Sequence, residues 1–108
     1  MNKYLFKALE VAKTSKCRYK HGAVVVSNGT IVASKTNKKI ATPIDNQWRR
    51  AHIHAEAAAV KAAGKYAAGS IVYVARVAAD GSPTNSKPCK KCEGFMDRYR
   101  IAQVVWTL

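Results

Sequence analysis

Helical and strand patterns alternate along the chain, and this alternation restricts the available folds more than any other feature. Apolar residues recur at intervals of three and four between Tyr4 and Ala12, which indicates an amphipathic helix. Two β-rich runs, 23–27 and 30–34, flank the dipeptide Asn28-Gly29. Because a type I′ turn needs positive φ at both central positions, Asn-Gly between such runs predicts a β-hairpin.

The second half of the chain repeats the alternation of helix and strand. An alanine-rich stretch predicts a helix that Gly64 ends, and Pro88 suits the first position of another helix. In chain order the expected elements are a helix at 54–63, a strand at 70–77, a helix at 88–99 and a strand at 101–108. Residues 35–50 are polar, and Pro43 leads us to expect irregular structure there.

The predicted order is therefore helix–strand–strand–helix–strand–helix–strand, which defines an α/β fold. With 108 residues and 48% hydrophobic side chains, the chain can bury a core but is too short for two independently folding ones, so residues 1–108 are expected to be a single domain. Strand–helix–strand units make right-handed crossovers, and their helices begin at the same edge of the sheet. The last two predicted helices should therefore start close together.

Two short motifs open these two helices: His54-Ala55-Glu56 and Pro88-Cys89-Lys90-Lys91-Cys92. Cys89 and Cys92 share one helix face, and the first turn of a helix favours thiolates, so both sulfurs can reach one ion. One imidazole with two thiolates leaves a fourth position for water, as in catalytic zinc sites. A nearby carboxylate can act as general base and acid, which requires His54 and Glu56 to project from the opening turn.

Each motif alone is open to other interpretations. A C-x-x-C pair can be a redox couple, although the expected thioredoxin-like pattern near the first strand is missing. It can also be half of a structural zinc site, for which Cys17, His21 or His52 would supply the fourth ligand. A lone H-x-E occurs often by chance, so the specificity comes from the two motifs together.

Together the motifs resemble the H-x-E…P-C-x-x-C signature of the zinc-dependent cytidine deaminase superfamily. The chain is most similar to compact deoxycytidylate- and nucleoside-type deaminases of bacteria and phages. The similar stretches are His21–Val26 with its hairpin, Tyr73–Arg76, Asn85–Cys92 and Val104–Trp106. The resemblance implies a three-layer α/β/α fold, in which the fifth strand usual for the family is expected to be missing.

The resemblance also implies a site and a reaction. His54, Cys89 and Cys92 would hold Zn²⁺, and Glu56 would transfer protons between water and the pyrimidine. The implied activity is hydrolytic deamination of cytosine to uracil in a (deoxy)cytidine nucleotide or nucleoside, which makes the protein a hydrolase acting on a C–N bond. Cytosine is preferred to adenine only because the resemblance is to the cytidine-type branch.

Further residues are expected to contact the substrate. By resemblance, Asn37 matches the family's asparagine that contacts the sugar, and the backbone N–H groups of Ala55 and Cys89 would lie near the base. His52 is a candidate at the edge of the pocket. Aromatic and guanidinium side chains can stack on a base and hold a phosphate, which makes candidates of Trp48, Arg49 and Arg50.

The net charge leaves the size of the substrate open. The chain has 19 Lys and Arg against 6 Asp and Glu, a formal charge of +13, which predicts an anionic partner. One alternative is therefore a deaminase acting on cytosine in single-stranded DNA or RNA. A second is a non-catalytic basic zinc module that binds nucleic acid, but such a module would not need Glu56.

Cellular location and assembly are inferred from weaker signals. Three cysteines cannot form a full disulfide framework, and the N-terminus carries no signal-peptide pattern. No apolar run approaches the ~18 residues that a transmembrane helix needs. We therefore expect a cytoplasmic protein in a reducing compartment, without membrane association. The resemblance and the short sheet also favour a homo-oligomer.

Overall fold

The computed structural model describes residues 2–44 and 47–108, and the side chains of residues 40–52 lie outside that description. The helices are α1 (Lys3–Lys13), α2 (Ala55–Ala63), α3 (Lys90–Arg98) and a 3₁₀ turn, η1 (Gly64–Tyr66). The strands are β1 (Lys20–Ser27), β2 (Thr30–Thr36), β3 (Lys38–Ile44), β4 (Gln47–Ile53), β5 (Ile71–Val77), β6 (Pro83–Thr84) and β7 (Gln103–Trp106). The three helices and four of these strands match the predicted elements within a few residues.

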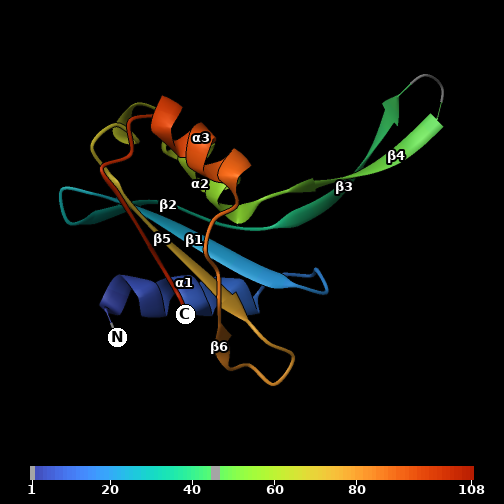
Figure 1. Ribbon diagram of the computed structural model, residues 1–108, viewed down its shortest axis with the longest axis horizontal. Helices are drawn as coiled ribbons and strands as arrows, with labels where there is room; N and C mark the ends of the chain where they lie inside the picture. Colours follow the sequence, from blue (N-terminus) through green and yellow to red (C-terminus); the bar gives the residue numbers. More distant parts are fainter. Residues whose placement is uncertain (1, 45–46) are drawn as a thin grey trace.

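The main sheet lies between two layers of helices (Figure 1). Its central strands are β1 and β5, which pair antiparallel, and β2 pairs antiparallel with the other side of β1. The unit β5–α3–β7 joins two parallel strands, as predicted for a crossover. α1 covers one face, and α2 and α3 cover the other. The three-layer α/β/α architecture is thus confirmed.

The outer side of β5 is shared by two short strands. β7 pairs with its first half and the two-residue β6 pairs antiparallel with Arg76 and Val77. The sheet therefore contains five strands, one more than predicted, although β6 is too short to stand for a full edge strand. Among the described residues, no helix is long and apolar enough to cross a membrane.

The described residues between 35 and 50 are mostly in strands and not irregular, contrary to the prediction. β2 continues to Thr36, and β3 and β4 form a separate antiparallel hairpin that extends from the body of the molecule (Figure 1). Pro43 lies within β3, opposite Trp48. In a two-stranded ribbon both strands are edges, so a proline that cannot donate a backbone hydrogen bond is tolerated. Trp48, Arg49 and Arg50 therefore belong to a strand and not to a loop.

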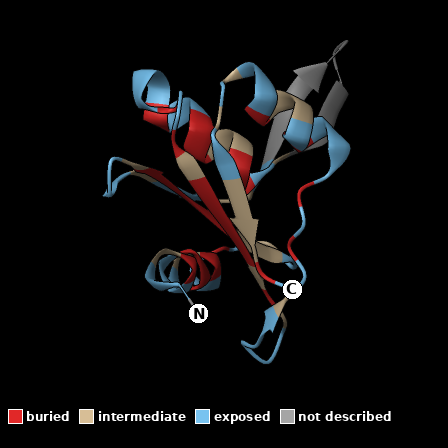
Figure 2. Ribbon diagram, turned by 60° about the vertical axis from the view of Figure 1, so that its left-hand side comes forward, coloured by how far each residue is buried: buried red, intermediate tan, exposed pale blue. Residues whose placement is uncertain are grey.

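Both faces of the central strands are buried (Figure 2). Val25 and Val74 face α2 and α3, whereas Val24 and Tyr73 face α1. Successive side chains on a strand point to opposite faces, so each central strand supplies both cores. This explains why 23–27 and 70–77 are nearly continuous apolar runs.

At two positions the structure explains why the residue is glycine. Asn28 and Gly29 have φ values of 50° and 76°, as the predicted type I′ turn requires. Gly22 lies where β1 packs directly against the backbone of α1. A Cβ atom there would lie 2.5 Å from Ala8 O and overlap Ala12 N. The absence of a side chain at Gly22 thus lets the helix backbone approach the sheet.

We expect Gly22→Ala to destabilise the protein by about 3 kcal/mol, because the new methyl group forces α1 away from β1. Gly94→Ala is a matched control: Gly94 lies in α3, a Cβ there meets nothing within 4 Å, and alanine in a helix should stabilise by about 0.5–1 kcal/mol. Urea unfolding of both variants measures the difference. Equal stability of Gly22→Ala and the wild type would contradict the close approach.

Candidate active site

The first motif lies at the point where the β3–β4 hairpin enters α2. His54 is the N-cap of α2, in extended conformation, and Glu56 lies in the first turn. Nδ1 of His54 is 3.9 Å from Oε1 of Glu56. The Glu56 residue is 5% exposed, whereas the His54 side chain is half exposed. The two side chains thus serve one site from the opening of the helix, as the sequence interpretation requires.

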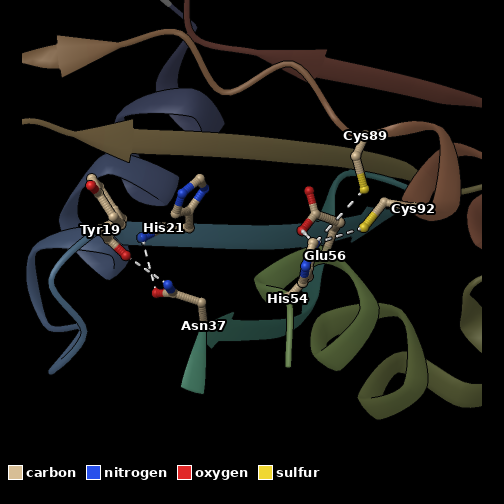
Figure 3. Close-up of polar contacts among 7 residues, drawn as sticks. All are labelled: Tyr19, His21, Asn37, His54, Glu56, Cys89 and Cys92. Atoms are coloured by element: carbon tan, nitrogen blue, oxygen red, sulfur yellow. Dashed lines mark hydrogen bonds and ion pairs between the residues drawn. The ribbon is translucent and has the colours of Figure 1, made fainter. Parts of the chain in front are cut away.

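The second motif meets the first from the neighbouring helix (Figure 3). Cys89 is the N-cap of α3, one position before the helix, and Cys92 is buried in its first turn. The Sγ atoms of Cys89 and Cys92 lie 4.0 Å and 3.1 Å from His54 Nδ1. All three ligand atoms lie within 4.8 Å of one another, so His54, Cys89 and Cys92 form a candidate metal site.

The chemistry of these donors fits Zn²⁺. Burial raises the pKa of the Cys92 thiol well above its usual range, and the Glu56 carboxylate beside it raises that pKa further. A bound cation would offset this cost, since zinc deprotonates the thiols that coordinate it. One imidazole and two thiolates also match the three protein ligands of an open, catalytic zinc site.

A cavity of about 280 Å³ opens beside this cluster. His54, Glu56 and Cys89 line one end, and Tyr19 and His21 line the other. The remaining lining residues are Asn37, Ile53, Ala55, Ser86, Lys87 and Pro88. The cavity therefore extends from the two motifs to the start of β1 and the end of β2, which lie next to each other in the sheet.

Asn37 lines the cavity, but much of its carboxamide is already used within the protein. Oδ1 accepts hydrogen bonds from Ser15 Oγ at 2.7 Å and from His21 N at 3.0 Å. Nδ2 donates to Tyr19 O at 2.6 Å. Asn37 thus ties the start of β1 to the end of β2, and among the described residues its second Nδ2 N–H has no partner. Its contact with the substrate sugar stays a prediction.

The expected rim residues are only partly described. All four lie on β4: Trp48, Arg49, Arg50 and His52, the last paired with Lys39 of β3. The side chains of these four β4 residues lie outside the described part of the structure. The two other candidates for a fourth metal ligand do not join the described cluster. Cys17 Sγ donates to Asn37 O at 3.5 Å, and His21 lies in the cavity wall.

Several cavity residues were not singled out as site candidates from the sequence. Tyr19, Ser86 and Lys87 reach the site through the packing of distant segments. The pKa of His21 is held below its usual value, first by burial and then by the nearby Arg76 and His54 charges. These effects favour the neutral form of His21 in the cavity wall.

The segment that leads to Cys89 is fixed by the C-terminal end of the chain. Thr107 N donates to Ser86 Oγ and Ser86 N donates to Thr107 O, each at 2.9 Å. Thr107 Oγ1 also donates to Thr84 O at 2.5 Å, and Ser86 Oγ donates to Val74 O at 2.9 Å. Ser86 and Thr107 are both buried. This network fixes the cavity wall to β5 just before the metal ligand.

The chain matches the family described as the cytidine and deoxycytidylate deaminase zinc-binding region over residues 1–108. The protein belongs to this family. No curated protein sequence matches the chain. The match extends over the whole sequence and so includes both motifs of the site.

Solved structures share the fold. The dCMP deaminase of cyanophage S-TIM5, in complex with dCMP and dUMP, has a TM-score of 0.72 at 23% identity, covering 98% of this chain and 82% of that chain. Acinetobacter baumannii RibD has a TM-score of 0.60 at 22% identity, covering 95% of this chain and 26% of that chain. This chain thus spans about a quarter of that protein. A third structure is a diaminohydroxyphosphoribosylaminopyrimidine deaminase/5-amino-6-(5-phosphoribosylamino)uracil reductase from Thermotoga maritima. Its TM-score is 0.60 at 23% identity, covering 95% of this chain and 28% of that chain.

Thr107→Val should destabilise the protein by about 1–3 kcal/mol, because it leaves buried partners of the hydroxyl group unsatisfied. It should also weaken Zn²⁺ binding about tenfold, since the segment 84–88 that leads to Cys89 loses its hydrogen bonds to the Thr107 side chain. Urea unfolding and chelator competition measure the two effects. Thr107→Ser keeps the hydroxyl group and should retain both the stability and the zinc affinity of the wild type. A Thr107→Val protein with unchanged zinc affinity would show that the network does not position Cys89.

Proposed function

We propose that the protein catalyses the hydrolytic deamination of cytosine to uracil in a (deoxy)cytidine nucleotide or nucleoside, with Zn²⁺ held by His54, Cys89 and Cys92. One observation carries the proposal: the buried carboxylate of Glu56 lies beside the candidate metal site, in the same cavity. The likeness to a cyanophage enzyme bound to dCMP and dUMP supports the choice of base.

Zinc, when bound, supplies a nucleophile at neutral pH by lowering the pKa of water from 15.7 toward about 7. Glu56 accepts a proton from the attacking water and delivers it to ring N3 as the oxygen bonds to C4. It then transfers the second proton to the exocyclic amine. The C4–N4 bond breaks, ammonia leaves, and the oxygen remains as the C4 carbonyl of uracil.

The protein positions the base around this proton transfer. Glu56 lies in the first turn of α2, where the helix dipole stabilises a negative charge. The N–H of Ala55, at the first position of the helix, lies among the donors that have no partner within a helix. Ala55 is fully buried and lines the cavity, so this N–H is available to an oxygen of the pyrimidine.

Cytosine within single-stranded nucleic acid is a second candidate substrate. A second hollow adjoins Asn37 and contains Lys16, Lys38 and Lys39, which would suit a phosphodiester backbone. The non-catalytic zinc module is a weaker alternative, because a structural zinc gains nothing from a buried carboxylate at its side. Turnover of dCMP, deoxycytidine and a cytosine-containing oligonucleotide compares the substrates directly.

Glu56→Gln should lower kcat by at least about 10²–10⁴-fold while zinc stays bound, because the amide fills the same space but cannot accept a proton. Release of uracil product and ammonia measures turnover, and elemental analysis measures zinc. Glu10→Gln is the control, since Glu10 is an exposed helix residue paired with Lys7. Undiminished activity of Glu56→Gln would remove the proposed mechanism.

A further inference from the structure

A hollow of about 240 Å³ lies between α3 and β7, apart from the metal ligands and Glu56. β7 pairs with β5 and with no other described strand, so its outer edge is open beside this hollow. Most of the lining is apolar and at least half buried: Pro88, Met96, Ile101, Val104 and Trp106. The two remaining lining residues, Glu93 and Asp97, are exposed. We call this hollow the acidic groove.

The acidic groove is exceptional on this chain. The sequence has only 6 Asp and Glu against 19 Lys and Arg, and two of those six line the groove. Neither Glu93 nor Asp97 forms an ion pair with a described basic group. An apolar surface with an acidic rim fits a basic partner that presents an apolar side chain.

The outer face of α1 has this chemistry. Phe6 is 54% exposed, although it is a large apolar residue. Lys3 and Lys7, both exposed, lie beside it at one turn and at one residue along the helix. Lys7 also lies 3.6 Å from Glu10, but such an exposed pair is easily exchanged. Lys3, Phe6 and Lys7 are called the basic face.

The two surfaces have the same helical spacing. Lys3, Phe6 and Lys7 occupy positions i, i+3 and i+4 of α1, and α3 places an acidic, an apolar and an acidic residue at the same intervals, from position 93 to position 97. Residues four apart are separated by about 6 Å along a helix axis and share one face. Both lysines can therefore reach both carboxylates while the phenyl ring lies between them.

The two surfaces cannot meet within one molecule. α1 packs on one face of the main sheet, and α3 packs on the opposite face (Figures 1 and 2). A contact between them therefore joins different copies of the chain. It is a heterologous contact, which leaves one basic face and one acidic groove free at the ends of each pair.

We propose that the basic face of one copy docks into the acidic groove of a second copy, with Phe6 against the apolar lining and Lys3 and Lys7 beside Glu93 and Asp97. Exposed ion pairs add little affinity and mainly determine register, so Phe6 supplies most of the attraction. Each chain carries a net charge of +13, but the Debye length at physiological salt is about 8 Å. General repulsion is therefore screened, whereas charges in contact still interact. The contact is small, which makes the association weak and dependent on concentration.

Sedimentation velocity of the zinc-loaded protein over a range of concentrations, at physiological salt, measures this association. Phe6→Ala should raise the dissociation constant about tenfold or more, because it removes the apolar anchor. Tyr66→Ala is the matched control: Tyr66 is 52% exposed, lies in η1, and is outside both surfaces. It should leave the dissociation constant unchanged. Circular dichroism verifies that each variant is folded.

Charge exchange tests the choice of partner surface. Lys3→Glu/Lys7→Glu and Glu93→Lys/Asp97→Lys should each weaken association at least about tenfold, since each places like charges opposite one another. The protein with all four substitutions has the net charge of the wild type and should associate like it, because the two surfaces are complementary again.

A second control separates the contact from net charge. Lys61→Glu/Lys65→Glu changes the net charge as much as the double substitution in α1, but both residues lie at the end of α2 and in η1, outside the two surfaces. This variant should not weaken association. Zinc content monitors the metal site in the variants of α3, which also carries Cys92.

Three results would overturn the inference: a wild-type protein that stays monomeric up to millimolar concentration, a Phe6→Ala protein that associates like the wild type, or a fourfold charge exchange that does not restore association. The last result would be expected if α1 paired with α1. The proposal does not depend on the proposed deamination, because it is measured by molecular mass and not by turnover.

Discussion

The start of two helices at one edge of the sheet is the constraint on which the site depends. β2 and β5 both run antiparallel to β1, so their C-terminal ends lie at the same edge. α2 begins near this edge at His54, and α3 begins there at Cys89. Residues that are 35 positions apart in the sequence are therefore brought to one point. The buried β1–β5 pair holds both helix ends in place.

This arrangement brings the negatively charged groups of Cys89, Cys92 and Glu56 together at a partly buried site. Burial raises the pKa of the Cys92 thiol most, and the nearby Glu56 carboxylate and Cys89 raise it further. A divalent cation removes the repulsion between the thiolates and converts them into ligands. The first turns of the two helices add their positive dipole ends. Metal binding and the proposed proton transfer by Glu56 thus depend on the same local electrostatics.

Much of the fold was predictable because its signals are local. The helical period of residues 4–12 and the turn at Asn28-Gly29 predicted their elements directly. The metal ligands were predictable because His54, Cys89 and Cys92 combine metal-binding residue types with specific spacings. Gly64 ends α2, as expected, with a positive φ of 56°.

Other features depend on tertiary contacts that no short window of sequence contains. β3 and β4 were missed because their residues are polar and Pro43 is a general sign against strands, although an isolated ribbon tolerates it. Thr107 and Ser86 carry no motif, and their role appears only when β7 brings the end of the chain against the segment before Cys89. The buried Nε atom of Arg76, which has no hydrogen-bond partner among the described residues, is likewise recognisable only in three dimensions.

The most direct test of the account is X-ray absorption spectroscopy of the zinc-loaded protein. We predict two sulfur neighbours at about 2.3 Å and two nitrogen or oxygen neighbours at about 2.0–2.1 Å, one of them from His54. Cys92→Ser should leave one sulfur neighbour. A site with three or four sulfur neighbours, or a protein that binds no zinc, would contradict the convergence of the two motifs into an open three-ligand metal centre.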